Sequence, residues 1–251
     1  MRKQAKNIVY TFLGAASIVV VWWIAAAIYD KPLLLPTPAE ALRELGRELF
    51  VAPRRALFWR SFCGSLWRSL AAFAAAGVLA GVFAFAGKAF APLRRILAPV
   101  VGVLRAVPTM SVILLLVLWA GGDRTPLFVS GLVIFPVLYS GLEGALAAVP
   151  VELEETARLY GGNAWHTFAH VYLPLSAPSF LPVAGGAASL TLKLTVAAEV
   201  LAQTRNSIGM LMQQTRVYFE IGRLMALTVA VVVASLLLEL IIYAVRKAVA
   251  Y

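Results

Sequence analysis

Residues 150–174 read PVELEETARLYGGNAWHTFAHVYLP, a long polar stretch in the second half of an otherwise apolar chain. Three glutamates, one arginine and two histidines surround a Gly-Gly pair. A proline followed by acidic residues is typical of a helix N-terminus, where the helix dipole favours negative charge. The glycine pair is expected to end this helix, Asn163 suits the N-cap of a second one, and Pro174 is expected to limit that second helix. The stretch therefore predicts two short helices that meet at a glycine corner outside a membrane.

The second of these helices carries two aromatic side chains on one face. Trp165 and Phe168 are three residues apart, so a helix places them side by side. A loop that faces only solvent has no use for an exposed aromatic pair, and such side chains are enriched where proteins bind one another. We expect this patch to contact a partner protein.

The composition is that of a membrane protein. Of the 251 residues, 61% are hydrophobic and 14% are charged, whereas about one quarter of a soluble domain is charged. The mean hydropathy is +0.85. The net charge of +10 is explained by Lys and Arg that flank membrane spans, and it indicates lipid headgroups as a partner and not nucleic acid. The single cysteine, Cys63, excludes an internal disulfide or a thiolate metal cluster.

Apolar runs predict a single all-α domain, residues 1–251, with six membrane-spanning helices of about 20 residues each. The expected spans are Ile8–Tyr29, Leu70–Gly87, Ile96–Ala120, Leu127–Val149, Ala177–Ala202 and Leu224–Val245. Residues 70–245 would form a five-span core that contains the polar loop at about 150–176. Pro108 is expected to kink or break the third span. Residues 38–49, PAEALRELGREL, are expected to form a short amphipathic surface helix.

Charge alone does not decide the orientation of these spans. An even number of spans places both termini on one side of the membrane. The two sides would then carry nearly equal numbers of Lys and Arg, so the positive-inside rule gives a tie. Only the basic N-terminal tail favours cytoplasmic termini.

The polar stretch resembles the cytoplasmic signature of permeases of ATP-binding-cassette importers, which reads E-A-A, three residues, G, nine residues and I-x-L-P. Here ETA at 155–157 is followed by RLY, Gly161, the segment GNAWHTFAH and VYLP, with the same spacing throughout. A threonine and a valine are mild departures from the pattern. The resemblance implies that the loop and both termini are cytoplasmic and that the loop docks on a separate ATPase. The residues that it assigns to this coupling are Glu155, Thr156, Ala157, Gly161, Asn163, Ala164, Trp165, His166, Phe168, Leu173 and Pro174.

The resemblance extends over nearly the whole chain. LLPTPAEAL after the first span, LRAVPT in the third, and AAEVL with SIGMLM after the fifth are similar to the nitrate, sulfonate, taurine and bicarbonate branch of these permeases. It implies the type I importer fold with six spans in the bacterial cytoplasmic (inner) membrane. The implied partners are two ATPase subunits, an external binding protein and a second permease copy in a homodimer. The permease would bind no cofactor and catalyse no reaction, ATP and Mg²⁺ would bind the ATPase, and the solute would be small and anionic or vitamin-like.

Four residues are candidates for the substrate pathway: Lys193, Glu199, Arg105 and Pro108. Lys193 lies about 24 Å along a helix that begins near Ala177, which places it within the outer half of the bilayer. A lysine there either pairs for structure or faces the pathway and attracts an anionic substrate, and the sequence leaves both open. Glu199 is six residues further on, about 240° around the helix, so the two side chains do not share a face.

Glu199 and Arg105 each have a simpler structural interpretation. Glu199 would lie near the outer mouth of the fifth span and hold the SIGMLM segment by hydrogen bonds. Arg105 would extend its charge to the membrane surface, with a role in a gate as the alternative.

Two other functions fit parts of the sequence. An ion-coupled secondary transporter would use Lys193 and Glu199 as coupling charges, but it would not need the docking signature. A membrane enzyme would need clustered catalytic side chains within the spans. The segment GVFAFAGKA departs from the phosphate-binding loop pattern in its spacing and its last residue. His166 and His170 have metal-compatible spacing but lack further ligands, so docking is the favoured interpretation.

Overall fold

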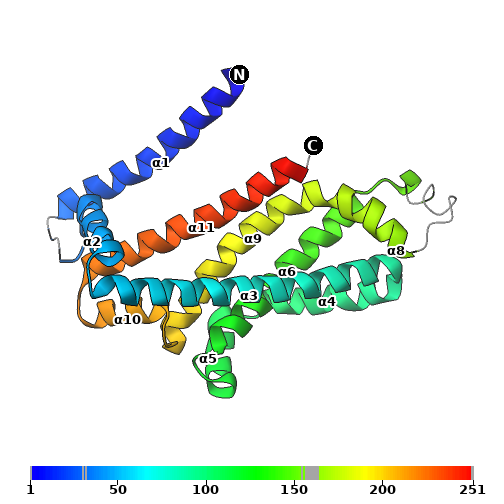
Figure 1. Cartoon of the computed structure of the whole chain (residues 1–251). Coiled ribbons are helices and arrows are strands. Elements are labelled where there is room, and N and C mark those ends of the chain that lie inside the picture. Colours follow the sequence, from blue (N-terminus) through cyan, green and yellow to red (C-terminus); the bar gives the residue numbers. More distant parts are fainter. Residues whose placement is uncertain (1, 30, 32, 154, 156–163, 250–251) are drawn as a thin grey trace. The chain divides into compact units, whose positions relative to one another are not determined.

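The computed structural model describes residues 2–29, 31, 33–153, 155 and 164–249. Every regular element within these ranges is a helix, which confirms the predicted all-α fold (Figure 1). The contacts fall into two compact units, Met1–Ser61 with Leu211–Ala230, and Phe62–Met210 with Val231–Tyr251. Each unit has its own packing, and the single permease domain stays a prediction.

The first unit is built around a short capped helix. It contains α1 (Arg2–Tyr29), α2 (Pro38–Phe50), the start of α3 (Arg54–Ala89), most of α10 (Ile208–Val217) and the start of α11 (Ile221–Val249). At the start of α2, Glu40 N–H donates to Thr37 Oγ1 at 3.3 Å and Thr37 N–H donates to the Glu40 carboxylate at 2.8 Å. This reciprocal capping box fixes the helix start and confirms the amphipathic helix predicted at 38–49.

A buried carboxylate holds α2 in the first unit. Glu48 has no exposed surface, and Arg223 of α11 donates to it from Nε at 2.7 Å and from Nη2 at 3.3 Å. Arg54 of α3 lies 3.6 Å from the same carboxylate. Because a buried charge is tolerated only when it is paired and hydrogen-bonded, this cluster specifies how the three helices meet.

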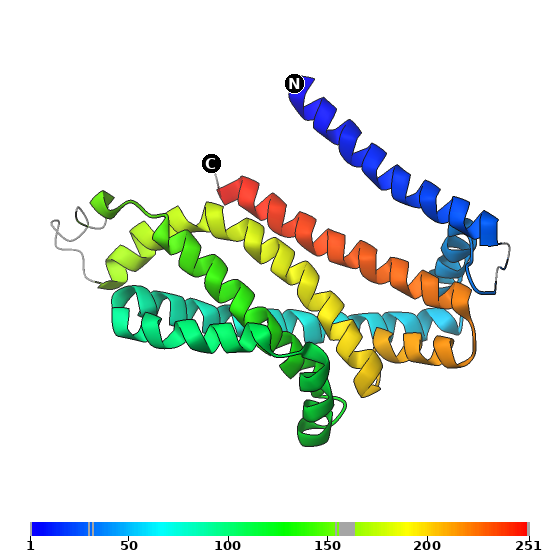
Figure 2. The ribbon, with the colours of Figure 1, turned by 180° about the vertical axis from the view of Figure 1, so that it is seen from behind.

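The second unit has a core of small and branched side chains. Besides the rest of α3 and α11 it contains α4 (Ala91–Ala106), α5 (Thr109–Ala120), α6 (Thr125–Ala147), α8 (Ala164–Thr167), the π-helix η1 (Phe168–Tyr172) and α9 (Leu173–Ala202). Ala76, Ala80 and Ala84 repeat every four residues on α3 and pack against Ile134 and Leu138 of α6 in one buried cluster. Small residues in this spacing let helices approach closely in a membrane. α3 and α4 run side by side in both views (Figures 1 and 2).

α9 packs along α6, which places its functional side chains. Gly141 of α6 is so close to α9 that a Cβ there would lie 2.5 Å from Val183 Cγ1. Ser130 of α6 and Thr195 of α9 share a buried hydrogen bond of 2.8 Å. The face of α9 opposite these contacts is left exposed.

The number of candidate spans agrees with the sequence-based prediction better than the residues at which the helices begin and end. Four helices are long and apolar enough to cross a membrane, Arg54–Ala89, Thr125–Ala147, Phe168–Ala202 and Ile221–Ala248. α4 and α5 together make a fifth candidate with a 91° bend at the Val107–Pro108 junction, which confirms the predicted break. The apolar part of α1 that the structure describes, Ala16–Tyr29, is shorter, so the sixth span stays a prediction.

One expected helix end is wrong, and one predicted span lies within a longer helix. α3 begins at Arg54, and it contains the span predicted at Leu70–Gly87, since hydropathy marks only the part of a helix that crosses lipid. Pro174 does not end a helix, since Phe168–Ala202 is helical throughout. The turn before it widens to a π-helix, in which Leu173 N–H donates to Phe168 O. A widened turn is a known way to accommodate a proline, which would otherwise clash with the preceding turn of an α-helix.

Candidate functional site

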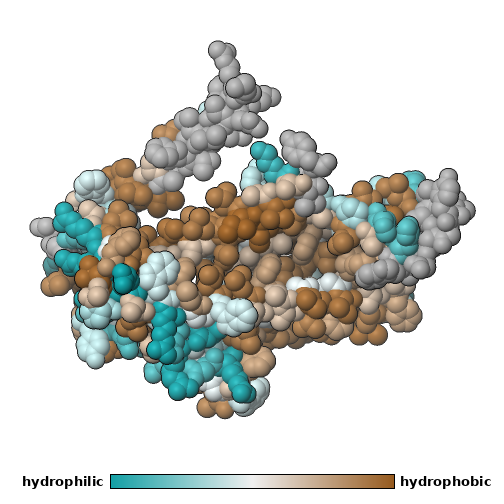
Figure 3. Space-filling view, in the orientation of Figure 1, coloured by the Kyte–Doolittle hydropathy of each residue, from teal (hydrophilic) through white to brown (hydrophobic). Residues whose placement is uncertain are grey.

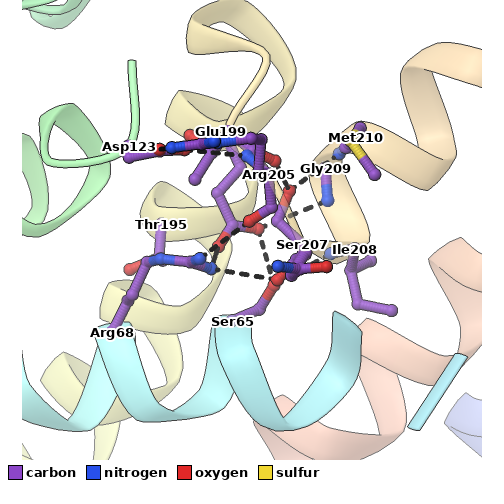
Figure 4. A network of polar contacts seen from close by, with 12 residues as sticks. Ser65, Arg68, Asp123, Thr195, Glu199, Arg205, Ser207, Ile208, Gly209 and Met210 are labelled. Atoms are coloured by element: carbon purple, nitrogen blue, oxygen red, sulfur yellow. Dashed lines mark hydrogen bonds and ion pairs between the residues drawn. The ribbon is translucent and has the colours of Figure 1, made fainter. Parts of the chain in front are cut away.

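A dense polar network surrounds Glu199 in the second unit (Figure 4). Its carboxylate accepts hydrogen bonds from Ser65 Oγ at 2.6 Å, Arg68 Nη1 at 3.0 Å and Gly209 N–H at 3.3 Å. Ser65 Oγ in turn accepts from Ile208 N–H at 2.9 Å. We call this set the Glu199 network; it joins α3, the end of α9 and the start of α10.

Arg68 extends the Glu199 network to the backbone between α9 and α10. Its guanidinium donates to Arg205 O at 2.9 Å and to Asn206 O at 3.4 Å. Gly64, one turn earlier on α3, leaves no room for a side chain, because a Cβ there would lie 2.5 Å from Asn206 O. Both contacts clamp this connection against α3.

The role predicted for Glu199 as a holder of the SIGMLM segment is confirmed by its hydrogen bond to Gly209. Glu199 has no exposed surface, and a Cβ at Gly209 would lie 2.4 Å from Glu199 Cβ. The hydrogen bonds from these donors offset the free-energy cost of burying the charged carboxylate. Its placement in the substrate pathway stays a prediction.

A second set of hydrogen bonds joins the backbone between α9 and α10 to the turn between α5 and α6. Arg205 donates to Asp123 from Nε at 2.9 Å and Nη2 at 2.5 Å, and its backbone N–H donates at 3.0 Å. Thr204 Oγ1 donates to Gly122 O at 2.8 Å. The side-chain and backbone hydrogen bonds from Arg205 lower the pKa of the Asp123 carboxyl below its ordinary value.

Lys193 lies on a different side of α9 from Glu199, as the helical spacing predicted. It is exposed, and it makes no hydrogen bond or ion pair within the described part of the chain. It belongs to an exposed stripe at helical spacing, which we call the Lys193 stripe: Gly186, Leu190, Lys193, Ala197 and Leu201. No carboxylate of the described residues neutralises this lysine.

The exposed face of α11 has a contrasting character. Most of its exposed side chains are large and apolar, and hydrophobic residues gather over this helix (Figure 3). Its exposed residues include Val232, Val233, Leu236, Leu237, Leu240 and Ile241. Such a face suits acyl chains, whereas the Lys193 stripe combines a charge with two of the smallest side chains.

Arg105 and Pro108 lie on either side of the bend between α4 and α5. Arg105 is exposed in the last turn of α4 and donates from Nη2 to Pro136 O of α6 at 3.1 Å. Pro108 is the N-cap of α5. The two residues therefore shape a broken span that is fastened to α6, and their place in a pathway or gate stays a prediction.

The predicted coupling segment is described only in part. Thr156, Ala157, Gly161 and Asn163 lie outside the described residues, and of Ala164 and Trp165 only the backbone, within α8, is described. Glu155, His166, Leu173 and Pro174 are exposed. The His166 and His170 rings stack at 4.2 Å, and no group of three metal-binding side chains occurs among the residues searched.

Two contacts fasten the described part of this segment to the end of α3. Phe168 is half-buried, and its ring meets the Phe85 ring edge-on with centroids 4.3 Å apart. Lys88 Nζ lies 5.4 Å from the centroid of the Tyr172 ring. Part of the Phe168 ring is therefore used to pack η1 against α3, and the contact of the Trp165–Phe168 patch with a partner protein stays a prediction.

Comparison with known proteins identifies the family. The family described as "Binding-protein-dependent transport system inner membrane component" matches residues 74–250. This chain is a member of it. The chain is thus the membrane-spanning permease subunit of an importer of the ATP-binding-cassette class, an inner-membrane protein whose ATPase activity resides in a separate subunit.

Curated relatives place this permease near transporters of small sulfonates. It is 29% identical to the taurine transport system permease protein TauC of Escherichia coli over 240 residues, which cover 92% of this chain and 85% of TauC. It is 27% identical to the putative aliphatic sulfonates transport permease protein SsuC of Escherichia coli, with 89% of this chain and 81% of SsuC covered. The riboflavin transport system permease protein RibX of Chloroflexus aurantiacus is 30% identical over 51% of this chain and 48% of RibX.

Solved structures confirm the type I importer permease fold. An inward-facing structure of the methionine ABC transporter MetNI matches with a TM-score of 0.70 at 18% identity, over 80% of this chain and 99% of that one. An amino acid ABC transporter crystallised with histidines matches with a TM-score of 0.58 at 17% identity. The match covers 76% of this chain and 92% of that one. Membership of this permease family also rules out the ion-coupled secondary transporter as the function of the chain.

Sequence reasoning missed the partners of Glu199. Ser65 and Arg68 are 134 and 131 residues away in the chain, in a stretch that was not assigned to a span. The signal in the sequence was the Glu199 carboxylate near the end of an apolar helix, because a buried carboxylate needs hydrogen-bond donors from other segments.

Proposed function

We propose that two copies of this permease form a translocation path for a small anionic solute, with Lys193 of each copy facing that path. The solute would be delivered by an external binding protein and moved by two ATPase subunits. The observation that carries this proposal is that Lys193, within the small-residue stripe of α9, is exposed and pairs with none of the described residues. If the stripe faced lipid, the charge of Lys193 would lie in hydrocarbon without water or an opposite charge beside it.

The cost of a charge in lipid supports this assignment. A lysine near the middle of a bilayer costs about 2.5–3.5 kcal/mol unless water or a partner compensates it. A water-filled path between two copies removes that cost and lets the charge act on the solute. Gly186 and Ala197 on the same stripe leave space beside the lysine. Side chains as large as those exposed on α11 would fill such a space.

The solute class follows from the sign of the charge and from the relatives. Two cationic side chains facing one path attract an anion by a field that the low dielectric of the membrane strengthens. The names of TauC and SsuC give taurine and aliphatic sulfonates as what those relatives transport. A sulfonate or a similar small anion is therefore the proposed solute here.

Coupling to the ATPase is proposed for residues 155–174. The spacing of the signature supports it, as do the contacts of Phe168 and Tyr172 with α3, which connect the segment to a long helix of the second unit. A segment fastened in this way can transmit a displacement by the ATPase to the spans. This assignment makes the segment and both termini cytoplasmic, and it makes ATP and Mg²⁺ ligands of the ATPase subunits.

The pathway assignment is tested by removing one charge. Lys193→Met keeps the side-chain length, so the variant should assemble with the ATPase and binding protein but take up a sulfonate at least tenfold more slowly. Lys247→Met, which removes a charge from the end of α11, should leave uptake unchanged. Normal uptake by Lys193→Met, or poor expression of that variant alone, would contradict the proposal.

The assembly is tested separately by mass. Native mass spectrometry of the purified complex should show two permease copies with two ATPase subunits. A complex with one copy of this permease for each ATPase pair would contradict the homodimer. Uptake should also disappear when the partner ATPase is inactivated by substitution.

A further inference from the structure

Phe219 stands at a helix end where glycine is the usual residue. α10 ends at Val217, and Phe219 two residues later has a φ of +57°. Phe219 N–H donates to Arg216 O at 3.3 Å, and Glu220 N–H donates to Thr215 O at 2.9 Å. These two hydrogen bonds form a Schellman motif, whose left-handed residue is most often glycine because any Cβ there lies too close to a carbonyl oxygen. The backbone alone would therefore favour glycine at this position.

The chain does not bury the Phe219 ring in return for this strain. Phe219 is 77% exposed, and the neighbouring Tyr218 is 75% exposed. A bulky residue in the left-handed region is an outlier that is typical of functional sites, since selection for stability would remove it. The exposed ring therefore points to a contact outside the chain.

Phe219 and Leu33 border a pocket of about 250 Å³ within the first unit. Leu33 is 80% exposed, so both apolar side chains lie at the surface. The pocket also contains two ion pairs, each with an N–O distance of 3.2 Å. These pairs are Arg54 with Glu44 and Arg223 with Glu220. Apolar side chains and fixed polar groups thus meet in one hollow.

This combination favours a protein partner over lipid. Aromatic side chains near a span end often lie among lipid headgroups, but acyl chains that filled this pocket would face four charged side chains and offer them no hydrogen bond. Exposed aromatic rings beside arginines are instead typical of the residues that dominate protein–protein binding. An apolar side chain of a partner can pack on Phe219 and Leu33 while polar groups beside it contact the ion pairs.

The position of the pocket on α3 indicates on which side of the membrane this partner lies. α3 is a single candidate span, so its two ends lie on opposite sides. Arg54 at its start lines the pocket, and Phe85 near its end contacts Phe168 of the proposed coupling segment. The pocket therefore faces the side opposite the ATPase, where the partner in the proposed function is the external binding protein.

We propose that Phe219, Leu33 and the pocket between them form a docking site for the external binding protein. The ring of Phe219 supplies apolar contact area on a backbone that the Schellman motif holds in place, so little conformational freedom is lost on binding. The inference rests on the proposed function for the identity of the partner and for the side of the membrane, and it does not depend on the pathway role of Lys193.

The test measures how tightly the purified binding protein of the same transport system binds the full-length permease with its ATPase in lipid nanodiscs. Phe219→Gly should raise the melting temperature, because it relieves the left-handed residue, and should weaken binding at least tenfold. Phe219→Tyr keeps the ring and should bind like wild type. Gln203→Gly is the matched backbone control: Gln203 is exposed at the end of α9 with a φ of +50°, so its variant should gain stability and keep full affinity.

Four results would overturn the docking site while leaving the proposed function intact. Wild-type affinity in Phe219→Gly would assign the ring to the membrane interface, and a lower melting temperature in that variant would show that the ring packs within the permease. An equal loss of affinity in Gln203→Gly would trace the effect to the backbone. Leu33→Ser should also weaken binding, and full affinity there would exclude the pocket. Failure of the wild-type complex to bind the binding protein at all would overturn the proposed function together with this inference.

Discussion

Ser65 and Glu199, 134 residues apart in the chain, meet in a buried hydrogen bond of 2.6 Å that joins α3 to the end of α9. The same Ser65 hydroxyl oxygen accepts from Ile208 N–H, so one side chain connects three segments of the second unit. This arrangement fastens the connection between α9 and α10 to α3.

Ser65→Ala should lower the free energy of unfolding by about 1–3 kcal/mol, because it leaves a buried carboxylate oxygen and a backbone N–H each short of a partner. Thermal unfolding in detergent measures this. Ser61→Ala is the matched control one turn earlier on α3, since the buried Ser61 hydroxyl has no hydrogen-bond partner among the residues that the structure describes. Equal losses for both variants would show that the network adds nothing beyond packing.

Gly64→Ala should destabilise the permease, although alanine is the better helix former. The new methyl would lie 2.5 Å from Asn206 O, which is backbone and cannot move aside without breaking the contacts of Arg68. Gly81→Ala, on the same helix with open space around its Cβ position, should be neutral or slightly stabilising. Comparison of the two melting temperatures checks the close approach, and a stable Gly64→Ala variant would rule it out.

Glu48→Ala should be one of the most damaging single changes in the first unit, at about 3 kcal/mol or more, because Arg223 would lose its buried partner. Glu44→Ala should cost far less, since Glu44 is 21% exposed and its pairs with Arg47 and Arg54 are partly solvated. A double-mutant cycle of Glu48→Ala with Arg223→Ala should show strong coupling. Additive effects would mean that the two side chains act independently.

Phe85→Leu should reduce uptake for each ATP hydrolysed, because it removes the edge-on ring contact that holds Phe168 of the proposed coupling segment. Phe83→Leu on the same helix removes a similar contact with Phe135 of α6, with centroids 6.1 Å apart, so it should lower stability without uncoupling. Coupling is measured as the ratio of uptake to ATP hydrolysis in proteoliposomes. The same ratio in both variants would argue against the mechanical role of Phe168.

The Asp123–Arg205 pair predicts a small dependence of stability on acid. Because Arg205 lowers the pKa of Asp123 below 3.8 in the folded permease, the pair stabilises it above that pH, and the contribution is lost as the pH falls through the folded-state pKa. Both side chains are largely exposed, so the effect should be slight and weaker in high salt. Asp123→Asn should lower the melting temperature slightly at neutral pH and leave it unchanged in strong acid; an equal loss at both pH values would contradict this origin.

Local sequence patterns were enough to predict the all-α membrane fold, the broken span at Pro108 and the family signature at 155–174. Each of these depends on local properties, namely apolar run length, a proline without an N–H, and fixed spacing along the chain. The sequence also separated Lys193 from Glu199, because helical geometry sets the angle between two residues of one helix. The surface helix at 38–49 followed in the same way from its opening proline and the helical spacing of its charges.

The packing of distant segments sets which residues surround Glu199 and which face of α9 stays exposed. Ser65 and Arg68 reach Glu199 across more than 130 residues, and no local pattern encodes such a pairing. The bounds of α3 and the π-turn before Pro174 were missed for a related reason. A helix continues where its neighbours provide packing, whatever its hydropathy, and it widens where a proline would otherwise clash with the turn before it.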